Sequence, residues 1–163
     1  MKYFSLFMIS LFILLAVACG QDTSLRPGFG REDLYLLIGS AQYSLNMDIE
    51  KVIADFGPDY DYAEARSCDY DGLDKSFLYD HAEFYTFPLK EGDRVSDIYS
   101  SSPDASTSKG IRVGAEKADV FAFYGEDCED TGYQLIYAIE GGSLCFDMED
   151  GVVKAFYITA RKL

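Results

Sequence analysis

The sequence predicts an α+β domain made of two tandem repeats, each containing one short helix followed by three strands. The first observation is a pair of matching segments, IEKVIADFG at 49–57 and KADVFAFYG at 117–125, which both end on an aromatic residue and a glycine. The second is the composition after each segment. There, short runs rich in aromatic and β-branched residues alternate with Gly and Asp, which is typical of connected strands. The matching order indicates a duplicated unit.

The two matching segments are predicted to be helices of about two turns. The first places apolar side chains at i, i+3, i+4 and i+7, and the second repeats the last three of these positions (Ile49, Val52, Ile53, Phe56; Val120, Phe121, Tyr124). Asp48 is expected to cap the first helix, and Gly57 and Gly125 suit the left-handed residue that ends many helices. Helices this short do not persist alone in water, so each must pack against a sheet.

The predicted strands follow at 76–79, 82–87 and 95–100, and again at 133–138, 143–148 and 152–159. Asp150-Gly151 is a strong signal for a hairpin turn, and 33–38 is expected to add a leading strand. These elements place the first repeat at 33–99 and the second at 111–163, within one domain, with 100–110 as a polar connector. The acidic segment 58–75 is an insertion in the first repeat, and such loops often carry binding residues.

The N-terminus predicts export and a lipid anchor. Residues 1–18 have the basic start, apolar middle and small-residue end of a secretory signal. The sequence LAVACG resembles the lipobox of bacterial lipoproteins, which implies cleavage before Cys19, attachment of diacylglycerol to its thiol, and extracytoplasmic anchoring to the membrane of a bacterium. Residues 19–32 would then form a flexible tether. The alternatives are a membrane helix, for which the apolar run is barely long enough, and a soluble secreted protein cut near Ala18.

The order of elements resembles small bacterial lipoproteins with a fold like that of the β-lactamase inhibitor protein. The resemblance covers roughly residues 33–160 and rests on the two short helices that end aromatic-Gly, each followed by a strand series. It implies one curved, mainly antiparallel sheet with both helices on one face and a concave face left open. It also implies a disulfide between Cys128 and Cys145, and it suggests inhibition of an enzyme as one version of the function.

Composition argues against several classes of function. A net charge of −14 would repel nucleic acid and anionic lipid head groups. The chain has one histidine, His81, and no CxxC pair, so we expect no zinc site, and likewise no other metal and no cofactor. A Cys68–His81 catalytic pair lacks an orienting group at a recognisable spacing. Two acidic runs lack the spacing of a calcium-binding EF-hand loop and fit hydrated surface better (Asp69, Asp71, Asp74; Glu126, Asp127, Glu129, Asp130).

The tyrosines are the candidate binding residues. The chain has 13 Tyr and 12 Phe, and five of the tyrosines lie on or beside predicted strands: Tyr79, Tyr85, Tyr99, Tyr137 and Tyr157. Strands 82–87 and 152–159 carry apolar residues on both alternating faces, whereas a sheet covered on one side should show one polar face. Either both faces are covered or the open one binds a ligand, and tyrosine suits binding because its rigid ring carries a hydrogen-bonding hydroxyl.

These observations predict a non-catalytic extracytoplasmic lipoprotein that binds a protein or peptide at the cell envelope, through an aromatic-rich sheet face and acidic loops. One alternative is a hydrolase acting through carboxylates of segment 58–75, for which a glycosidase would need two acids facing each other across a cleft. The other is a structural envelope component without a discrete ligand.

Overall fold

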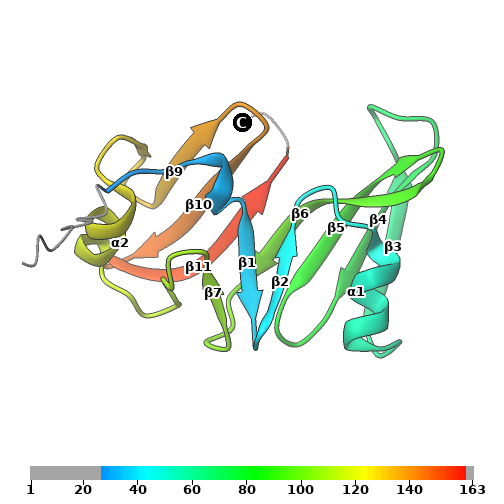
Figure 1. The fold of residues 1–163 in the computed structure, drawn as a ribbon, viewed down its shortest axis with the longest axis horizontal. Helices are drawn as coiled ribbons and strands as arrows, with labels where there is room; N and C mark the ends of the chain where they lie inside the picture. Colours follow the sequence, from blue (N-terminus) through cyan, green and yellow to red (C-terminus); the bar gives the residue numbers. More distant parts are fainter. Residues whose placement is uncertain (1–26, 161–163) are drawn as a thin grey trace, which may run out of the picture.

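Two antiparallel sheets and two short helices make up residues 27–160, the part of the chain that the computed structural model describes (Figure 1). The helices are α1 (Ile49–Phe56) and α2 (Lys117–Tyr124), and a 3₁₀ turn η1 spans Arg31–Asp33. The strands are β1 (Tyr35–Ile38), β2 (Ala41–Ser44), β3 (Asp61–Arg66), β4 (Leu73–Leu78), β5 (Glu83–Leu89), β6 (Gly92–Ser100), β7 (Ala105–Thr107), β8 (Glu129–Asp130), β9 (Gln134–Ile139), β10 (Gly142–Glu149) and β11 (Val152–Thr159). The predicted α+β class is confirmed.

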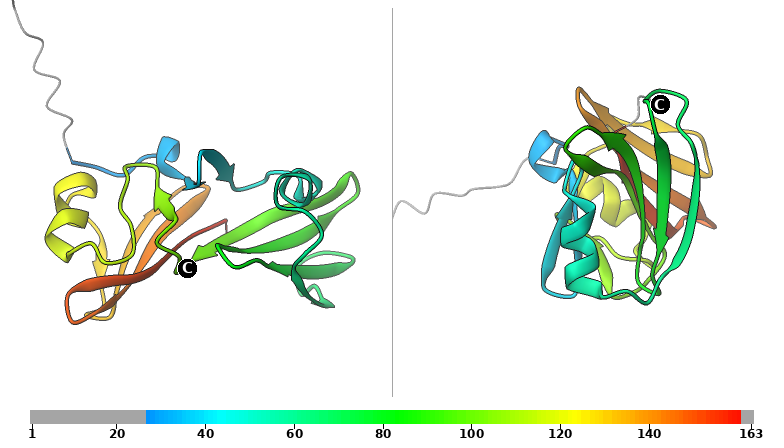
Figure 2. Two further views of the ribbon diagram at one scale, coloured as in Figure 1. Left: turned by 90° about the horizontal axis from the view of Figure 1, so that it is seen from below. Right: turned by 90° about the vertical axis from the view of Figure 1, so that its right-hand side faces the viewer.

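The larger sheet has eight strands in the order β3-β4-β5-β6-β11-β10-β9-β8, and the smaller has three in the order β2-β1-β7. Every pairing is antiparallel. On each side of the central β6–β11 pair, the strands run outward in reverse chain order. Both helices and the small sheet lie on one face of the large sheet, and the opposite face carries no helix or strand of residues 27–160 (Figure 2).

The strand count differs from the prediction in three places. Each helix is followed by four strands of the large sheet instead of three, because β3 and β8 add an edge strand at each end of that sheet. The segment 58–75, expected to be irregular, therefore contains β3. The leading strand β1 does not join the large sheet but forms the small one with β2 and β7, and β7 lies within the predicted connector 100–110. The chain thus builds two sheets, not one.

The helix ends follow the expected chemistry. The Asp48 side chain accepts the Glu50 N–H at 3.1 Å, as an N-cap should. Gly57 and Gly125 have φ values of 87° and 83°, in the region that favours glycine, and their N–H groups donate to the carbonyls of Ile53 and Phe121. The predicted Asp150-Gly151 turn is confirmed as well, with φ values of 53° and 76° between β10 and β11.

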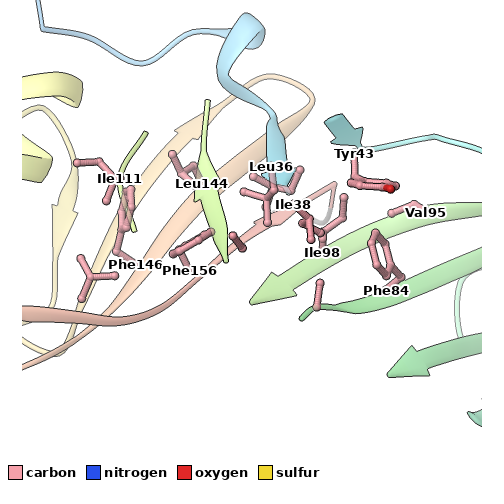
Figure 3. Close-up of a cluster of buried hydrophobic side chains, with 14 of the residues drawn as sticks. Leu36, Ile38, Tyr43, Phe84, Val95, Ile98, Ile111, Leu144, Phe146 and Phe156 are labelled. Carbon is pink, nitrogen blue, oxygen red and sulfur yellow. The ribbon is translucent and has the colours of Figure 1, made fainter. Parts of the chain in front are cut away.

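The hydrophobic core lies between the large sheet and the layer of helices and small sheet (Figure 3). Leu36 and Ile38 of β1 reach from the small sheet toward Ile98 and Phe156 at the centre of the large one. The small sheet also ties the helices together. Tyr43 of β2 donates to Asp55 of α1 at 3.2 Å, and Tyr124 of α2 donates to Thr107 of β7 at 2.8 Å. Because strand side chains alternate, each residue between these core positions points to the opposite face.

Candidate functional site

A hollow of about 570 Å³ lies on the face of the large sheet that faces away from the helices, which we call the open face. Its lining consists of three tyrosines and two carboxylates: Tyr85, Tyr99, Tyr157, Glu83 and Asp97. All five side chains are half-buried. Three of the five tyrosines predicted from the sequence therefore lie together at one hollow.

Strand register brings these residues together. Glu83 of β5 lies opposite Tyr99 of β6, and Tyr85 lies opposite Asp97, so the four form two neighbouring cross-strand pairs. Tyr99 in turn lies opposite Tyr157 of β11, with ring centres 6.4 Å apart. The hollow thus spans the central β6–β11 pair, where the two halves of the large sheet meet. A register shift after Tyr85 ends this alternation on β5.

The carboxylates and tyrosine hydroxyls of the hollow interact directly. Tyr85 donates a hydrogen bond to Glu83. Burial, this hydrogen bond and the charge of Glu83 raise the pKa of Tyr85 to about 12. Burial, with the charges of Asp147 and Glu83, also raises the pKa of Tyr99. Both hydroxyls therefore stay protonated at neutral pH, and the hydrogen of the Tyr85 hydroxyl is already donated to Glu83.

A second row of polar side chains continues the open face across β9 and β10. The Gln134 amide donates to Asp147 at 2.8 Å and to the Tyr157 hydroxyl at 3.3 Å. Burial is the main cause that raises the pKa of Tyr157, and its contact with Cys145 adds to it. Asp147 thus adds a third carboxylate beside the tyrosines, at a position that no sequence motif marks.

Tyr79 and Tyr137, the other two predicted binding residues, lie on the helix side of the sheet. Tyr137 is 1% exposed and donates to the Gly125 carbonyl at 2.7 Å, at the end of α2. Tyr79 is half-buried and donates to the Gly57 carbonyl at 3.1 Å, at the end of α1. Each hydroxyl satisfies a carbonyl that the helix end leaves without a partner inside the helix. The structure therefore gives these tyrosines a helix-anchoring contact, away from the hollow.

The predicted Cys128–Cys145 disulfide is not formed: the three cysteines of residues 27–160 are free. Cys128 contacts Tyr137 and the core, whereas Cys145 contacts Tyr157 from the open-face side of β10. Glu129 of β8 lies opposite Ile136 of β9, and Ile136 lies opposite Cys145 of β10. Cys128, which precedes Glu129, is therefore about two strand spacings from Cys145. A disulfide requires Cα atoms within about 7 Å, and two spacings amount to about 9.5 Å.

No family model matches this chain, and no curated protein or solved structure matches it. The resemblance to inhibitor-like lipoproteins stays a prediction.

A second hollow of about 400 Å³ continues the open face beyond the first one. It is lined by Ser67, Asp69, Tyr70, Asp74, Phe87, Ser96 and Ala160. The Tyr70 ring stacks on Phe87 with ring centres 5.1 Å apart. The two hollows are adjacent: Ser96 lines the second, and its hydroxyl donates to Asp97, which lines the first. Acids from the predicted insertion 58–75 therefore do reach the open face, although the sequence alone gave no reason to pair them with Phe87.

The remaining chemical candidates lie apart from one another. Cys68 precedes β4 and His81 follows it, so the length of this six-residue strand, about 20 Å, separates them. His81 is exposed in the β4–β5 turn, with Nδ1 3.4 Å from Asp104 Oδ2 beside a separate hollow of about 500 Å³. Across residues 27–160, His, Cys, Asp and Glu side chains nowhere gather in a group of three or more that could bind a metal ion.

The predicted lipid-attachment residue, Cys19, and the signal segment 1–18 lie outside the described residues. Among residues 27–160, no helix combines the length and the apolar character needed to cross a membrane.

Proposed function

We propose that this protein is a non-catalytic extracytoplasmic lipoprotein whose open face binds a protein or peptide partner at the cell envelope. The observation that carries the proposal is the hollow lined by Tyr85, Tyr99, Tyr157, Glu83 and Asp97 on a sheet face that no described helix or strand covers. The function is binding, because the hollow offers rigid rings, hydroxyl groups and carboxylates at fixed positions.

The chemistry of the hollow suits a macromolecular partner. Interface cores are enriched in tyrosine, which adds a large contact area at a small cost in conformational entropy. The tyrosines here project from the centre of an eight-stranded sheet, where paired strands on both sides fix the backbone. A surface that is already ordered loses little freedom on binding, which favours affinity.

The anchor is part of the same proposal. Diacylglycerol on Cys19 would hold the domain at the membrane surface, since two acyl chains give stable anchoring where one is marginal. The Cys19→Ser variant is expected to move from the membrane fraction to the medium. Retention of that variant in the membrane fraction would contradict the lipobox interpretation and leave the binding proposal intact.

We also propose that the domain arose by tandem duplication of a helix–strand unit, giving one curved large sheet like that of the inhibitor-protein fold. Three pairs of equivalent contacts support it. The tyrosine-to-glycine bonds are Tyr79–Gly57 and Tyr137–Gly125. The backbone bridges are Asp48–Arg94 and Glu116–Val152. Bonds that close each helix run from Gly57 to Ile53 and from Gly125 to Phe121. Within each kind of contact, the two sets occupy corresponding positions in the chain.

The binding proposal is tested by capturing a partner from native envelope extract with the immobilised protein. Tyr157→Ala is expected to reduce capture at least tenfold, because it removes a central wall of the hollow. Tyr62→Ala is the matched control: Tyr62 is an exposed tyrosine whose ring packs toward Phe77, away from the hollow. Equal loss in both variants, or no specific capture by the wild-type protein, would refute the proposal.

A second candidate function is a carboxylate-based hydrolase, favoured by the presence of Asp69 and Asp74 in one hollow with Tyr70. A glycosidase needs two carboxyls on either side of the scissile bond. Incubation of the protein with purified cell-wall glycan, followed by an assay of released reducing ends, separates the two functions. The binding proposal predicts no release. Release that Asp74→Asn abolishes would establish the hydrolase instead.

A further inference from the structure

The outer edge of β3 is the longest unpaired strand edge in the part of the chain that the structure describes. β3 ends the large sheet, and its six residues are all exposed and pair with β4 alone. The edge at the other end, β8, has two residues, and the edges of the small sheet, β2 and β7, have four and three. In an antiparallel pair, alternate residues direct their N–H and C=O groups away from the partner strand, so β3 offers backbone donors and acceptors to a further strand.

β3 lacks two of the devices that commonly keep a sheet edge from pairing. Its register with β4 runs from Asp61–Leu78 to Arg66–Leu73 without a shift, so no β-bulge interrupts it, and it contains no proline. Its protection is a set of charged side chains. Because charges repel some partners and attract others, they select the strand that can pair here rather than exclude every strand.

A hollow of about 460 Å³, which we call the edge hollow, lies beside β3 on the helix side of the large sheet. α1 lies over the same end of the sheet (Figure 1). The Tyr62 ring is 49% exposed and packs against Phe77 with ring centres 5.4 Å apart. Side chains opposite one another in a sheet point to the same face, so a strand added to β3 can direct a side chain across Tyr62 into the edge hollow. Its apolar lining residues are Ile49, Ile53, Tyr60, Tyr62 and Phe77.

The charge around this edge is negative. Lys75 lines the edge hollow, but its Nζ lies 2.6 Å from Asp93 Oδ2, which also lines it. The exposed charged residues of β3 and of the edge hollow are three carboxylates and one guanidinium: Glu50, Asp61, Glu64 and Arg66. A cationic side chain on an added strand is therefore attracted to the edge.

The inner neighbour of β3 shows which side chains suit the strand. Lys75 of β4 lies opposite Glu64, and Phe77, two residues along β4, lies opposite Tyr62. A strand on the outer edge has the same spacing from β3 as β4 has. The same alternation, a cation followed two residues later by an aromatic ring, therefore complements the outer edge as well.

We propose that the outer edge of β3 binds an extended segment of a partner protein as a ninth strand of the large sheet, antiparallel to β3. The segment carries a lysine or arginine opposite Glu64 and, two residues later, an aromatic ring opposite Tyr62 at the mouth of the edge hollow. Backbone hydrogen bonds hold the strand, and the two side chains select it. This surface is separate from the open face and does not rest on the function proposed for that face.

A second copy of this chain fits the edge less well than a foreign segment. Each copy has a net charge of −14, so two copies repel each other. The register that places Arg66 of one copy opposite Glu64 of the other also places Ala65 opposite Ala65. Only residues 64–66 of each β3 then pair, whereas a foreign segment can pair along all six residues.

The test is a titration of the isotopically labelled protein with the blocked peptide Thr-Thr-Lys-Ser-Phe-Thr, followed by nuclear magnetic resonance. The peptide is expected to shift the backbone amides of residues 49–53 and 61–66 and to leave those of residues 97–99, on the open face, unchanged. Two further versions carry N-methyl groups on the odd or on the even residues. Because alternate N–H groups of a strand point to opposite edges, one version should lose at least tenfold in affinity and the other should change by less than about twofold. Equal affinity of the two versions, or no binding of the parent peptide, would overturn the proposal.

Exchanging the charges locates the peptide on β3. Glu64→Lys is expected to lose at least tenfold in affinity for the peptide and to recover it when glutamate replaces the lysine of the peptide. Glu64 is exposed, so the circular dichroism of the folded protein should be retained. Glu126→Lys makes the same change in the exposed loop after α2 and is the control, which should bind both peptides as wild type does. Equal effects of the two variants would overturn the assignment to β3.

Sedimentation tests the second copy as the occupant. The protein alone should sediment as a monomer at the concentration of the titration. A dimer that Glu64→Lys dissociates would assign the edge to a second copy and overturn the proposal.

Two tyrosine variants separate failure of this inference from failure of the proposed function. Tyr62→Ala should weaken peptide binding and leave capture by the open face unchanged, and Tyr157→Ala should do the reverse. If the peptide fails while Tyr157→Ala abolishes capture, the edge inference is wrong and the open-face proposal stands. If nothing is captured while the peptide binds and Tyr62→Ala weakens it, the open-face proposal is wrong and the edge inference stands. Loss of peptide binding in Tyr157→Ala alone would place the peptide on the open face and overturn the edge inference.

Discussion

The two faces of the large sheet are made by the same strands and differ in almost every physical property. On the helix side, Phe84, Ile98, Phe146 and Phe156 have no exposed surface and pack into one core. On the open side, most of their immediate neighbours in the chain are half-buried tyrosines and carboxylates, and the exceptions, Cys145 and Ala155, are small and buried. Because strand side chains alternate, one residue along a strand is enough to pass from the core to the candidate binding surface.

This difference separates the positions that form the core from the positions that line the candidate binding surface, although the same strands supply both. The helix side excludes water, and its polar groups are few and hydrogen bonded, as in the bond from Tyr124 to Thr107. The open side keeps three carboxylates near its tyrosine rings. Substitutions on the helix side should therefore act on folding, and those on the open side should act on binding.

The largest expected effect comes from truncating a core ring. Phe146→Ala removes a fully buried ring that packs against Tyr124 and Tyr137, and it should lower the free energy of unfolding by about 3–5 kcal/mol. Tyr99→Ala, on the open side, should lower the free energy of unfolding by only about 1 kcal/mol, since the ring is half-buried and water can enter the space that it leaves. Urea denaturation of the two variants measures the difference. Similar losses would mean that the open face is also part of the core.

Removing single hydroxyl groups gives a smaller and more local comparison. Tyr137→Phe should lower the free energy of unfolding by about 1–2 kcal/mol, because it leaves the half-buried Gly125 carbonyl without its donor beside a ring that is 1% exposed. Tyr79→Phe should cost about half as much, since the equivalent bond to Gly57 is longer and half-buried. Tyr157→Phe, on the open side, should change stability by less than about 0.5 kcal/mol. A cost for Tyr157→Phe equal to that for Tyr137→Phe would contradict the division between faces.

The sequence predicted the elements that contribute most of the buried apolar side chains. All seven predicted strands and both helices were found, because each segment is rich in apolar residues; Ile49 to Phe56 in α1 also has a clear helical period, whereas β10 is buried on nearly every residue. The strands that were missed lack this signal. All six residues of β3 are exposed, β8 has only two residues, β7 lies in a Ser-rich segment, and β2 has four residues with a single buried side chain. Edge strands and short strands form because a neighbouring strand pairs with them, so their own composition does not predict them.

The candidate site was predicted in part. Sequence composition pointed to the tyrosines, and the structure gathers Tyr85, Tyr99 and Tyr157 at one hollow. It could not separate them from Tyr79 and Tyr137, because that separation depends on strand register and on which face the helices cover. Glu83 and Asp97 were not predicted either. A usable signal was present in the sequence: each carboxylate lies two positions from a tyrosine on the same strand, and period-2 spacing places both on one face.

A pH titration compares one tyrosine from each side of the sheet. Tyr43, packed beside Asp55 on the helix side, and Tyr85, beside Glu83 on the open side, both have a pKa raised to about 12. Because the folded-state pKa exceeds the unfolded value of about 10, the stabilisation is complete below about pH 10 and is lost as the pH rises toward 12. Tyr85→Phe should lose less stability than wild type over that range, by about 1 kcal/mol after solvent screening.

The Glu83→Gln variant sharpens this titration. It removes the charge and weakens the hydrogen bond that raise the pKa of Tyr85, while burial remains. Tyrosinate absorbance should therefore show Tyr85 titrating at a lower pH in Glu83→Gln than in wild type. Tyr43, on the other side of the sheet, should titrate unchanged. A shift of Tyr43 in this variant would show that the two faces are electrostatically coupled.

The reactivity of the three thiols tests the assignment of side chains to the two faces without changing the stability of the protein. Cys68 is exposed and should react quickly with a maleimide in the folded protein. Cys145 is buried, and burial raises its pKa to about 11, so it should react only as fast as the protein unfolds. Cys128, half-buried on the helix side, should react at an intermediate rate.

Non-reducing mass spectrometry should find no Cys128–Cys145 bond, and reductant should leave the free energy of unfolding unchanged. Detection of that bond would require the two thiols to meet across the sheet, which would contradict the assignment of side chains to opposite faces.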